Sequence, residues 1–369
     1  MLAVQTKLNS AILACAVLLL LPACQTTPPP TPAKRDYIVT AAKPDRLFVI
    51  DAQARKVVSD FKIPDANGWL GTVVAPKDGK VAYVLVNKME SIAGIDLTTG
   101  QQVFRADLSS GNERVKSIYS INVTPDGRRL IVYELPTRLE LNEYKVLEPR
   151  FRIFDTAAGV GAAPIATFPA PRRIHMILPR LDNRRFFALG VQLYEFDLTD
   201  GKLINTQGVR DWNRAGYSSP DLINFWPISE PTNIFSAPVI SMRGEGADGV
   251  LRTSLMAIDL DSGSLTYKDF EDTKTLIFTT VVSPRKPDAY GVFLHLSKIN
   301  TDTGTVTKRV DLPHSFYTVA MASDGSEVFT GGTTCSIGFF DPDTLAQRAM
   351  VQLPGCPDQS NATMQVVRR

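Results

Sequence analysis

One pattern recurs seven times along this chain: an apolar, strand-like run closes on an acidic or amide residue, and a short turn follows. These closing residues, called the marker residues below, are Asp51, Asp96, Asp155, Asp197, Asp259, Asn300 and Asp341. After most of them comes a turn with Gly, Asp or Thr and then a second strand-like run, which predicts a β-hairpin. We interpret each marker as a turn residue that accepts hydrogen bonds from nearby backbone amides, in preference to a metal-binding or catalytic carboxylate.

The spacing of the markers predicts the architecture. Successive markers lie 45, 59, 42, 62, 41 and 41 residues apart, and such a period in a chain of short strands is typical of the blades of a β-propeller. A second turn with Pro, Asp or Gly recurs between apolar runs, at residues 75–79, 124–127, 283–288 and 322–325. We therefore predict an all-β fold, a seven-bladed β-propeller of WD40-like or YVTN-like repeats. Residues 37–40 and 364–367 should pair within one blade and close the ring.

The first 34 residues differ in kind from the repeats. Residues 1–24 carry an early lysine, an apolar core too short to cross a bilayer and small residues before Cys24, which predicts an export signal of the lipoprotein type. Lipidation would then fall on Cys24, and the alternative is simple secretory cleavage a few residues away. Residues 25–34 are rich in proline and should form a semi-rigid tether, so the propeller domain is expected at 35–369.

The charge of the chain disfavours nucleic acid as a partner. The formal net charge is +2, with basic and acidic residues interspersed. The densest basic spots are Arg172–Arg173 and Arg184–Arg185 with Arg180. We interpret them as solvated loop or strand-edge positions, with docking to an acidic partner as the alternative.

Cysteine and histidine content points away from a redox or metal centre on this chain. Cys335 and Cys356 are the cysteines of the repeat region, and in an oxidising compartment they are expected to form a structural disulfide. The sequence has no Cys-x-x-Cys-His haem-attachment motif, and His175, His295 and His314 are far apart. It also lacks a Gly-x-Ser-x-Gly elbow, a P-loop and a dinucleotide fingerprint. A non-catalytic scaffold is the simplest interpretation.

The two long marker intervals indicate unusual surfaces. One holds residues 134–144, which are too rich in apolar and charged side chains for a plain linker. The other holds Trp212 and Tyr217 and leads into Phe225 and Trp226. Long loops with aromatic residues on a rigid ring are typical of recognition surfaces, and the alternative is that these aromatics only cover their own blade.

Several segments together resemble the β subunits of quinohemoprotein amine dehydrogenases. The resemblance runs from residue 35 to about residue 355 and is densest at residues 86–91, 95–100, 113–117, 138–141, 170–172 and 312–317. In that family the β subunit is a seven-bladed propeller without a redox group, and it belongs to a periplasmic heterotrimer. The resemblance therefore implies a haem-carrying α subunit with two c-type haems and a γ subunit that carries cysteine tryptophylquinone, with no cofactor on this chain.

The resemblance leaves the residues of the interface open. We take Trp212, Tyr217, Phe225 and Trp226, or His314 and Tyr317 of the last matching segment, as the interface candidates. Two features depart from the family pattern: Cys24 suggests membrane anchoring in the periplasm, and the pairing of Cys335 with Cys356 rests on the residues alone. The competing function is a stand-alone exported propeller that binds a ligand or cell-wall component, and a propeller enzyme acting alone is disfavoured because no catalytic constellation is present.

Overall fold

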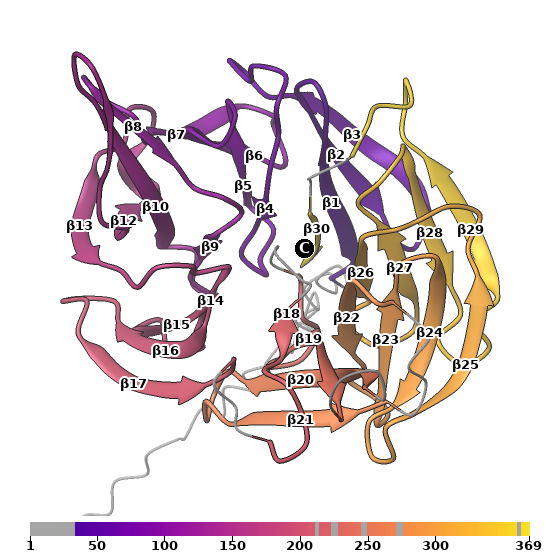
Figure 1. Cartoon of the computed structure of the whole chain (residues 1–369). Coiled ribbons are helices and arrows are strands. Elements are labelled where there is room, and N and C mark those ends of the chain that lie inside the picture. The colour runs from indigo at the N-terminus through magenta and orange to yellow at the C-terminus, as the bar shows by residue number, and fades with distance from the viewer. Residues whose placement is uncertain (1–33, 211–213, 223–227, 245–248, 271–275, 360–362) are drawn as a thin grey trace, which may run out of the picture. The chain divides into compact units, whose positions relative to one another are not determined.

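Seven antiparallel sheets stand around a common centre in the computed structural model (Figure 1). The structure describes residues 34–210, 214–222, 228–244, 249–270, 276–359 and 363–369, and contacts gather Lys34–Arg369 into one compact unit. The chain is thus an all-β, seven-bladed β-propeller, as the marker spacing predicts. Within these ranges the structure has one short 3-10 helix, η1 (Thr156–Ala158), and no helix long and apolar enough to cross a membrane.

Each blade is described from its inner to its outer strand. Blade 1 is β30 (Met364–Arg368), β1 (Asp36–Ala42), β2 (Arg46–Asp51) and β3 (Lys56–Lys62). Blade 2 is β4 (Val73–Val74), β5 (Val81–Val86), β6 (Ser91–Asp96) and β7 (Gln102–Asp107). Blade 3 is β9 (Ile121–Val123), β10 (Arg129–Leu139), β12 (Arg150–Asp155) and β13 (Pro164–Pro169), and it also carries β8 (Glu113–Lys116) and β11 (Tyr144–Val146). Blade 4 is β14 (Met176–Pro179), β15 (Arg185–Leu189), β16 (Gln192–Asp197) and β17 (Leu203–Gly208).

The remaining three blades follow the same order. Blade 5 is β18 (Asp221–Leu222), β19 (Ile234–Arg243), β20 (Val250–Asp259) and β21 (Leu265–Asp269). Blade 6 is β22 (Thr279–Val282), β23 (Asp288–Val292), β24 (His295–Asn300) and β25 (Thr305–Asp311). Blade 7 is β26 (Thr318–Met321), β27 (Val328–Gly331), β28 (Ser336–Phe340) and β29 (Gln347–Gln352). The two longer marker intervals therefore correspond to blades 3 and 5.

The marker residues are the last residue of the third strand in six blades, and in blade 7 Asp341 directly follows the third strand. A side-chain oxygen of each marker accepts a hydrogen bond from a backbone N–H two or three residues further on, and the shortest of these bonds in each turn measures 2.7–3.0 Å. Asn300 makes the same contact with its amide oxygen. These bonds confirm the interpretation of the markers as turn residues, because their side chains satisfy amides that the tight turn leaves unpaired.

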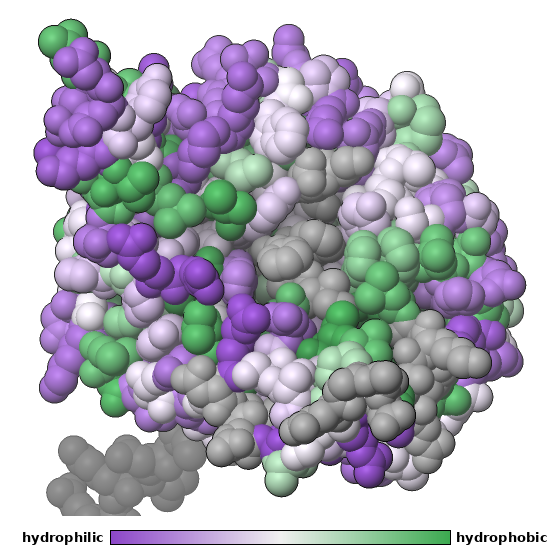
Figure 2. Space-filling model, viewed as in Figure 1, coloured by the Kyte–Doolittle hydropathy of each residue, from purple (hydrophilic) through white to green (hydrophobic). Residues whose placement is uncertain are grey.

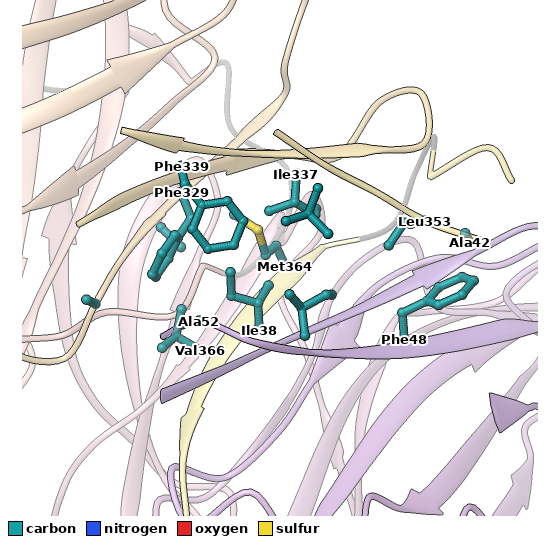
Figure 3. Close-up of a cluster of buried hydrophobic side chains, with 14 of the residues drawn as sticks. Ile38, Ala42, Phe48, Ala52, Phe329, Ile337, Phe339, Leu353, Met364 and Val366 are labelled. Atoms are coloured by element: carbon teal, nitrogen blue, oxygen red, sulfur yellow. The ribbon is translucent and has the colours of Figure 1, made fainter. Parts of the chain in front are cut away.

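The ring closes through the two ends of the described chain. Strand β1 pairs with β30 in antiparallel register from Asp36↔Arg368 to Thr40↔Met364, which confirms the predicted closure. Figure 3 shows the cluster that packs blade 7 against blade 1: Ile38 lies near Met364, Phe329 and Phe339, and Phe48 lies at the other end of the cluster, near Leu353. Closing the ring pairs the free strand edge that an open sheet would expose.

Apolar side chains fill the gaps between neighbouring blades. In β5, for example, Val84 packs into the cluster shared with blade 1, whereas Leu85 packs into the cluster shared with blade 3. The inner strands therefore bury both faces, which explains why they appear in the sequence as nearly continuous apolar runs. Outer strands such as β3 alternate between exposed and partly buried residues.

The ring has two distinct faces. Because strand direction alternates within each blade, the turns after the first and third strands gather on one face, which we call the turn face. The connections after the second and fourth strands gather on the other, which we call the long-loop face. Arg35 donates its N–H to the Arg369 carbonyl at 2.8 Å, so both ends of the domain lie on the turn face.

Candidate functional site

A hydrophobic pocket lies on the long-loop face between blades 3 and 4. Its volume is about 500 Å³, and its wall includes Ile118, Leu135, Val146 and Ile174. Ile118 is 46% and Val146 is 69% exposed, so the apolar surface is open to solvent. Figure 2 shows hydrophobic residues gathered near β9 and β10, and a second group near β23 and β26. Contiguous exposed apolar surface of this kind marks binding sites on soluble proteins.

The pocket exists because β10 continues beyond its blade. The inner half of β10 pairs with β9 and β12, whereas its outer half, Leu135–Leu139, pairs with β8 on one side and β11 on the other. We call this three-stranded projection, residues 113–116, 135–139 and 144–146, the arm. Near its tip Leu141 is 97% and Tyr144 is 78% exposed. The segment at 134–144 that the sequence marks as unusual is thus mainly a β structure that projects from the ring.

A buried ion network anchors the arm. Glu134 is fully buried. Its Oε2 accepts a hydrogen bond from Arg150 Nε at 2.8 Å and forms an ion pair with Arg152 Nε at 3.2 Å. Arg150 also binds Glu113 of β8, at 2.5 Å. Burial raises the pKa of Glu134, and the two arginines oppose that rise. A buried carboxylate with two cationic partners helps to fix the direction in which β10 leaves the blade, because breaking a buried ion pair is costly.

The rim of the pocket is basic. Arg172 is exposed and pairs with Glu148 at 2.8 Å, and Arg173 is exposed without a carboxylate partner among the described residues. Burial lowers the pKa of His175, with Arg210 and Arg173 adding repulsion, so the imidazole is neutral at neutral pH. The pocket thus combines an apolar wall with positive charge at its edge. This combination suits an apolar group that carries a nearby negative charge.

A second apolar patch on the same face holds one of the interface candidates. The Tyr317 ring lies 5.1 Å from that of Phe278 and 6.1 Å from that of Phe293, and the two phenylalanine rings stack at 4.0 Å. All three are partly exposed, and Leu276 and Leu294 are exposed beside them in the sequence. We call Phe278, Phe293 and Tyr317 the aromatic trio. Rigid, half-buried aromatic groups of this kind are typical of interface hot spots.

His314 makes its hydrogen bonds within blade 7 and its entry loop. Its Nδ1 lies 2.9 Å from the Ser315 carbonyl oxygen and its Nε2 lies 3.0 Å from Ser336 Oγ. The ring also lies 4.2 Å from that of the buried Phe316. These contacts fix the loop that presents Tyr317, so His314 has a structural role whether or not a partner touches it.

Tyr217 is engaged by its own blade. Its hydroxyl donates to Asp269 Oδ2 at 3.0 Å, and the Arg214 guanidinium lies 3.6 Å from its ring centroid. Arg214 also holds Asp269 through two hydrogen bonds of 2.6 Å, and these contacts lower the Asp269 pKa to about 2. The observed contacts of Tyr217 therefore agree with the alternative that this aromatic residue covers its own blade. Trp212, Phe225 and Trp226 lie outside the described residues, as does Cys24.

In the basic spot at 180–185, Arg180 is buried and is not the solvated residue that the sequence predicts. Arg180 is only 7% exposed, binds Glu195 Oε1 at 2.5 Å and lies over the Phe187 ring. Arg185 shares the same carboxylate at 3.0 Å. The prediction was wrong for Arg180, because Glu195 on β16, the second strand along from β14, supplies a buried partner that the local sequence does not reveal.

Cys335 and Cys356 are bonded in this structure, with their Cα atoms 4.7 Å apart. Cys335 ends the β27–β28 connection and Cys356 follows β29, so the bond ties two neighbouring connections on the long-loop face. In the part of the chain that the structure describes, no three His, Cys, Asp or Glu side chains are placed to hold a metal ion.

Comparisons with known proteins establish the fold and no family. No protein-family model matches the sequence, and no curated protein matches it. Among solved structures, a protein of unknown function from Desulfotomaculum acetoxidans is 12% identical with a TM-score of 0.59, over 90% of this chain and 98% of that one. Hydrazine synthase of Kuenenia stuttgartiensis is 11% identical with a TM-score of 0.55, over 84% and 90% of the two chains. The dihydro-haem d1 dehydrogenase NirN is 13% identical with a TM-score of 0.53, over 89% and 74%.

These neighbours share the propeller fold with this chain, and the name of one of them, NirN, refers to haem d1. At such low identity the likeness extends to the fold alone. Sequence reasoning missed the pocket between blades 3 and 4. The only local signal was the excess of apolar residues at 134–144. Arg172 and Arg173 are distant from this segment in sequence, and the fold brings them to the same pocket.

Proposed function

We propose that this chain is the non-catalytic propeller subunit of a periplasmic quinohemoprotein amine dehydrogenase. Its role is to hold a haem-carrying α subunit and a quinone-carrying γ subunit together, while the cofactors of those partners oxidise primary amines to aldehydes and carry the electrons away. The protein is exported, and lipidation of Cys24 would tether it to a membrane. This chain contributes binding surface and rigidity.

The observation that carries the proposal is where the resembling segments lie. Residues 113–117 and 138–141 belong to or adjoin the arm, and residues 170–172 reach the rim of its pocket. Residues 86–91 span the β5–β6 connection, and residues 312–317 include Tyr317 of the aromatic trio. These five of the six densest segments meet on the long-loop face, although they are distant in sequence. A shared recognition surface explains such a convergence, whereas the demands of the fold alone would spread similar residues over both faces.

The surface itself is suited to docking. Two apolar patches, the pocket beside the arm and the aromatic trio, are presented by connections of a closed ring that cannot easily deform. A rigid surface with separate aromatic and aliphatic anchors loses little conformational entropy on binding. We expect the two patches to engage partner chains simultaneously.

The proposal is tested by purifying the native protein from its source, counting the co-purifying chains and recording a visible spectrum. We expect two further chains and the absorbance of c-type haem. The chain expressed alone should be colourless and inactive towards amines. Amine oxidation by the isolated chain would refute the scaffold role.

Interface variants locate the surface within that complex. Tyr317→Ala should weaken assembly by roughly 1–4 kcal/mol if the ring is a hot spot, and Trp212→Ala tests the other candidate segment in the same way. Leu203→Ala is the matched control, because Leu203 is 49% exposed on the outer strand β17, away from both patches. Unchanged assembly in both variants would refute the proposed surface and leave the scaffold role standing.

The pocket also supports the second candidate, a stand-alone exported binding module. A cavity of about 500 Å³ with apolar walls is large enough for a small ligand. Neighbouring genes distinguish the two functions: a dihaem chain and a short cysteine-rich chain beside this one favour the dehydrogenase. A native protein that purifies without partners favours the binding module.

A further inference from the structure

The turn face carries a cleft of its own at the centre of the ring. A cavity of about 420 Å³ adjoins a smaller one of about 110 Å³, and Lys77, Ser229 and Glu230 line both. Lys34 and Arg368, from the two ends of the described domain, line the larger one. We call the two together the axial cleft. It lies on the face opposite to the arm and the aromatic trio.

Glu230 is the buried polar group of this cleft. The residue is only 9% exposed; its Oε1 accepts a weak hydrogen bond from Ser236 N–H at 3.4 Å, and its Oε2 has no hydrogen-bond partner among the described residues. Burial raises the pKa of Glu230 well above its usual range, and the nearby Lys77 lowers it by less. The rise favours the protonated carboxyl group, which has an O–H to donate. Native proteins rarely leave such a group unpaired unless a ligand or water completes it.

The mouth of the cleft has an excess of positive charge. Lys34, Lys77 and Arg368 are exposed, and none of them pairs with a carboxylate in the described ranges. Asp78 also lines the cleft, but its Oδ2 forms an ion pair with Lys80 Nζ at 3.4 Å. Counting the exposed charged residues of the lining, Lys34, Lys77, Arg368 and Asp78, the formal charge of the mouth is +2. A cation such as a protonated amine would be repelled here, whereas an oxyanion would be attracted.

The neighbouring chain segments hold the cleft in shape. Ser229 donates its hydroxyl to the Val366 carbonyl at 3.0 Å, and Arg368 donates its N–H to the Lys77 carbonyl at 2.9 Å. These bonds join the segment before β19, the end of β30 and the β4–β5 turn. Three parts of the ring that are remote in sequence therefore meet at one preorganised site.

We propose that the axial cleft binds a phosphate-type oxyanion, held by Lys34, Lys77 and Arg368 at its mouth and by the O–H of Glu230 at its floor. A phosphate dianion matches the formal charge of the mouth and offers several acceptor oxygens. The group can come from a free phosphate compound or from a lipid headgroup. Lys34 lies ten residues after Cys24, the predicted lipid attachment point, which would hold this face near a membrane surface.

The first arm of the test uses inorganic phosphate. Calorimetric titration of the full chain at constant ionic strength should show saturable binding, and Lys77→Ala should weaken it at least tenfold. Glu230→Gln keeps a neutral donor and should bind within about threefold of the original. Lys56→Ala removes the same charge from the exposed outer strand β3 and serves as the control.

The second arm separates the two sources. Vesicles of phosphatidylglycerol with phosphatidylcholine are compared with vesicles of phosphatidylcholine alone, using protein that lacks the lipid. Binding to the anionic vesicles that free phosphate displaces, and that Lys77→Ala abolishes, identifies a headgroup. Phosphate binding without vesicle binding identifies a soluble ligand. Absence of saturable binding in both arms, or equal losses in Lys56→Ala and Lys77→Ala, overturns the proposal.

Discussion

Asp269 shows how a single carboxylate organises the entry to blade 5. It accepts hydrogen bonds from Arg214, Tyr217 and Ser254, and these bonds lower its pKa from 3.8 to about 2. Since the folded-state pKa is depressed, the stabilisation is present above the unfolded value of 3.8 and is lost as the pH falls through about 2. The same contacts hold Tyr217 against its own blade.

Replacing Asp269 by Asn should therefore destabilise the protein in a pH-dependent way. A hydrogen bond to a charged group contributes about 1.5–3 kcal/mol when buried, and partial exposure reduces this, so we expect a loss of about 1–2 kcal/mol at neutral pH. Urea unfolding at a series of pH values measures it, and the difference should shrink towards pH 2, about the folded-state pKa. Asp302→Asn is the control, because Asp302 is exposed and its carboxylate has no partner in the described ranges. A difference that does not change with pH would contradict the explanation.

At the scale of the element, each marker turn is stabilised by hydrogen bonds between residues that are close in sequence. Asp259 accepts from the N–H groups of Asp261 and Ser262, both at 2.9 Å, and thereby caps the β20–β21 turn. Asp259→Ala leaves both amides without that acceptor and should cost about 0.5–2 kcal/mol, as for the loss of a helix cap. Asp259→Asn should be nearly neutral, because Asn300 performs the same task in blade 6. Equal losses in the two variants, measured by urea unfolding, would show that the charge matters more than the acceptor geometry.

The disulfide is a second element-scale device. Cys335 and Cys356 are 21 residues apart, and a bond that closes a loop of this length stabilises a protein by about 2–4 kcal/mol, mainly by restricting the unfolded chain. The double variant Cys335→Ala with Cys356→Ala should lose that amount. Mass spectrometry of the unreduced protein should find the two peptides linked. Two alkylatable thiols in the folded protein would show that this disulfide does not form.

The sequence predicts those elements whose contacts are local in the chain. Marker residues predict the third strand of every blade because a turn and its cap involve residues two or three positions apart. Glu134 gives no such local signal: its partners Arg150 and Arg152 lie on β12, so its burial depends on how β10 and β12 pair. The aromatic trio likewise comes from three separate connections, at residues 278, 293 and 317. Sites built by the ring itself are therefore invisible until the ring is known.

At the scale of the whole molecule, the closed ring is the condition for every surface described above. The axial cleft joins Lys34 to Arg368, and the inner strand β30 inserts between the core of blade 7 and that of blade 2. The open end of an unclosed propeller would expose a strand edge and two apolar blade faces. Folding and both binding faces should therefore depend on a few residues at the end of the chain.

Deleting residues 364–369 tests this dependence. The deletion removes Met364, Val366 and Val367, which are at most 8% exposed, and burial of such side chains contributes about 1.5–3 kcal/mol each. The sum is comparable with the whole stability of a typical domain, about 5–15 kcal/mol, so we expect the shortened chain to lose cooperative unfolding or to aggregate. Deleting Arg369 alone is the control: it loses two backbone hydrogen bonds with Arg35 and the contacts with Leu97 and Tyr37, but no buried apolar side chain, and should unfold nearly as the full chain does. A shortened chain that unfolds cooperatively at the same urea concentration as the full chain would show that blade 1 is stable without its inner strand, and that closure by β30 is not what holds the ring together.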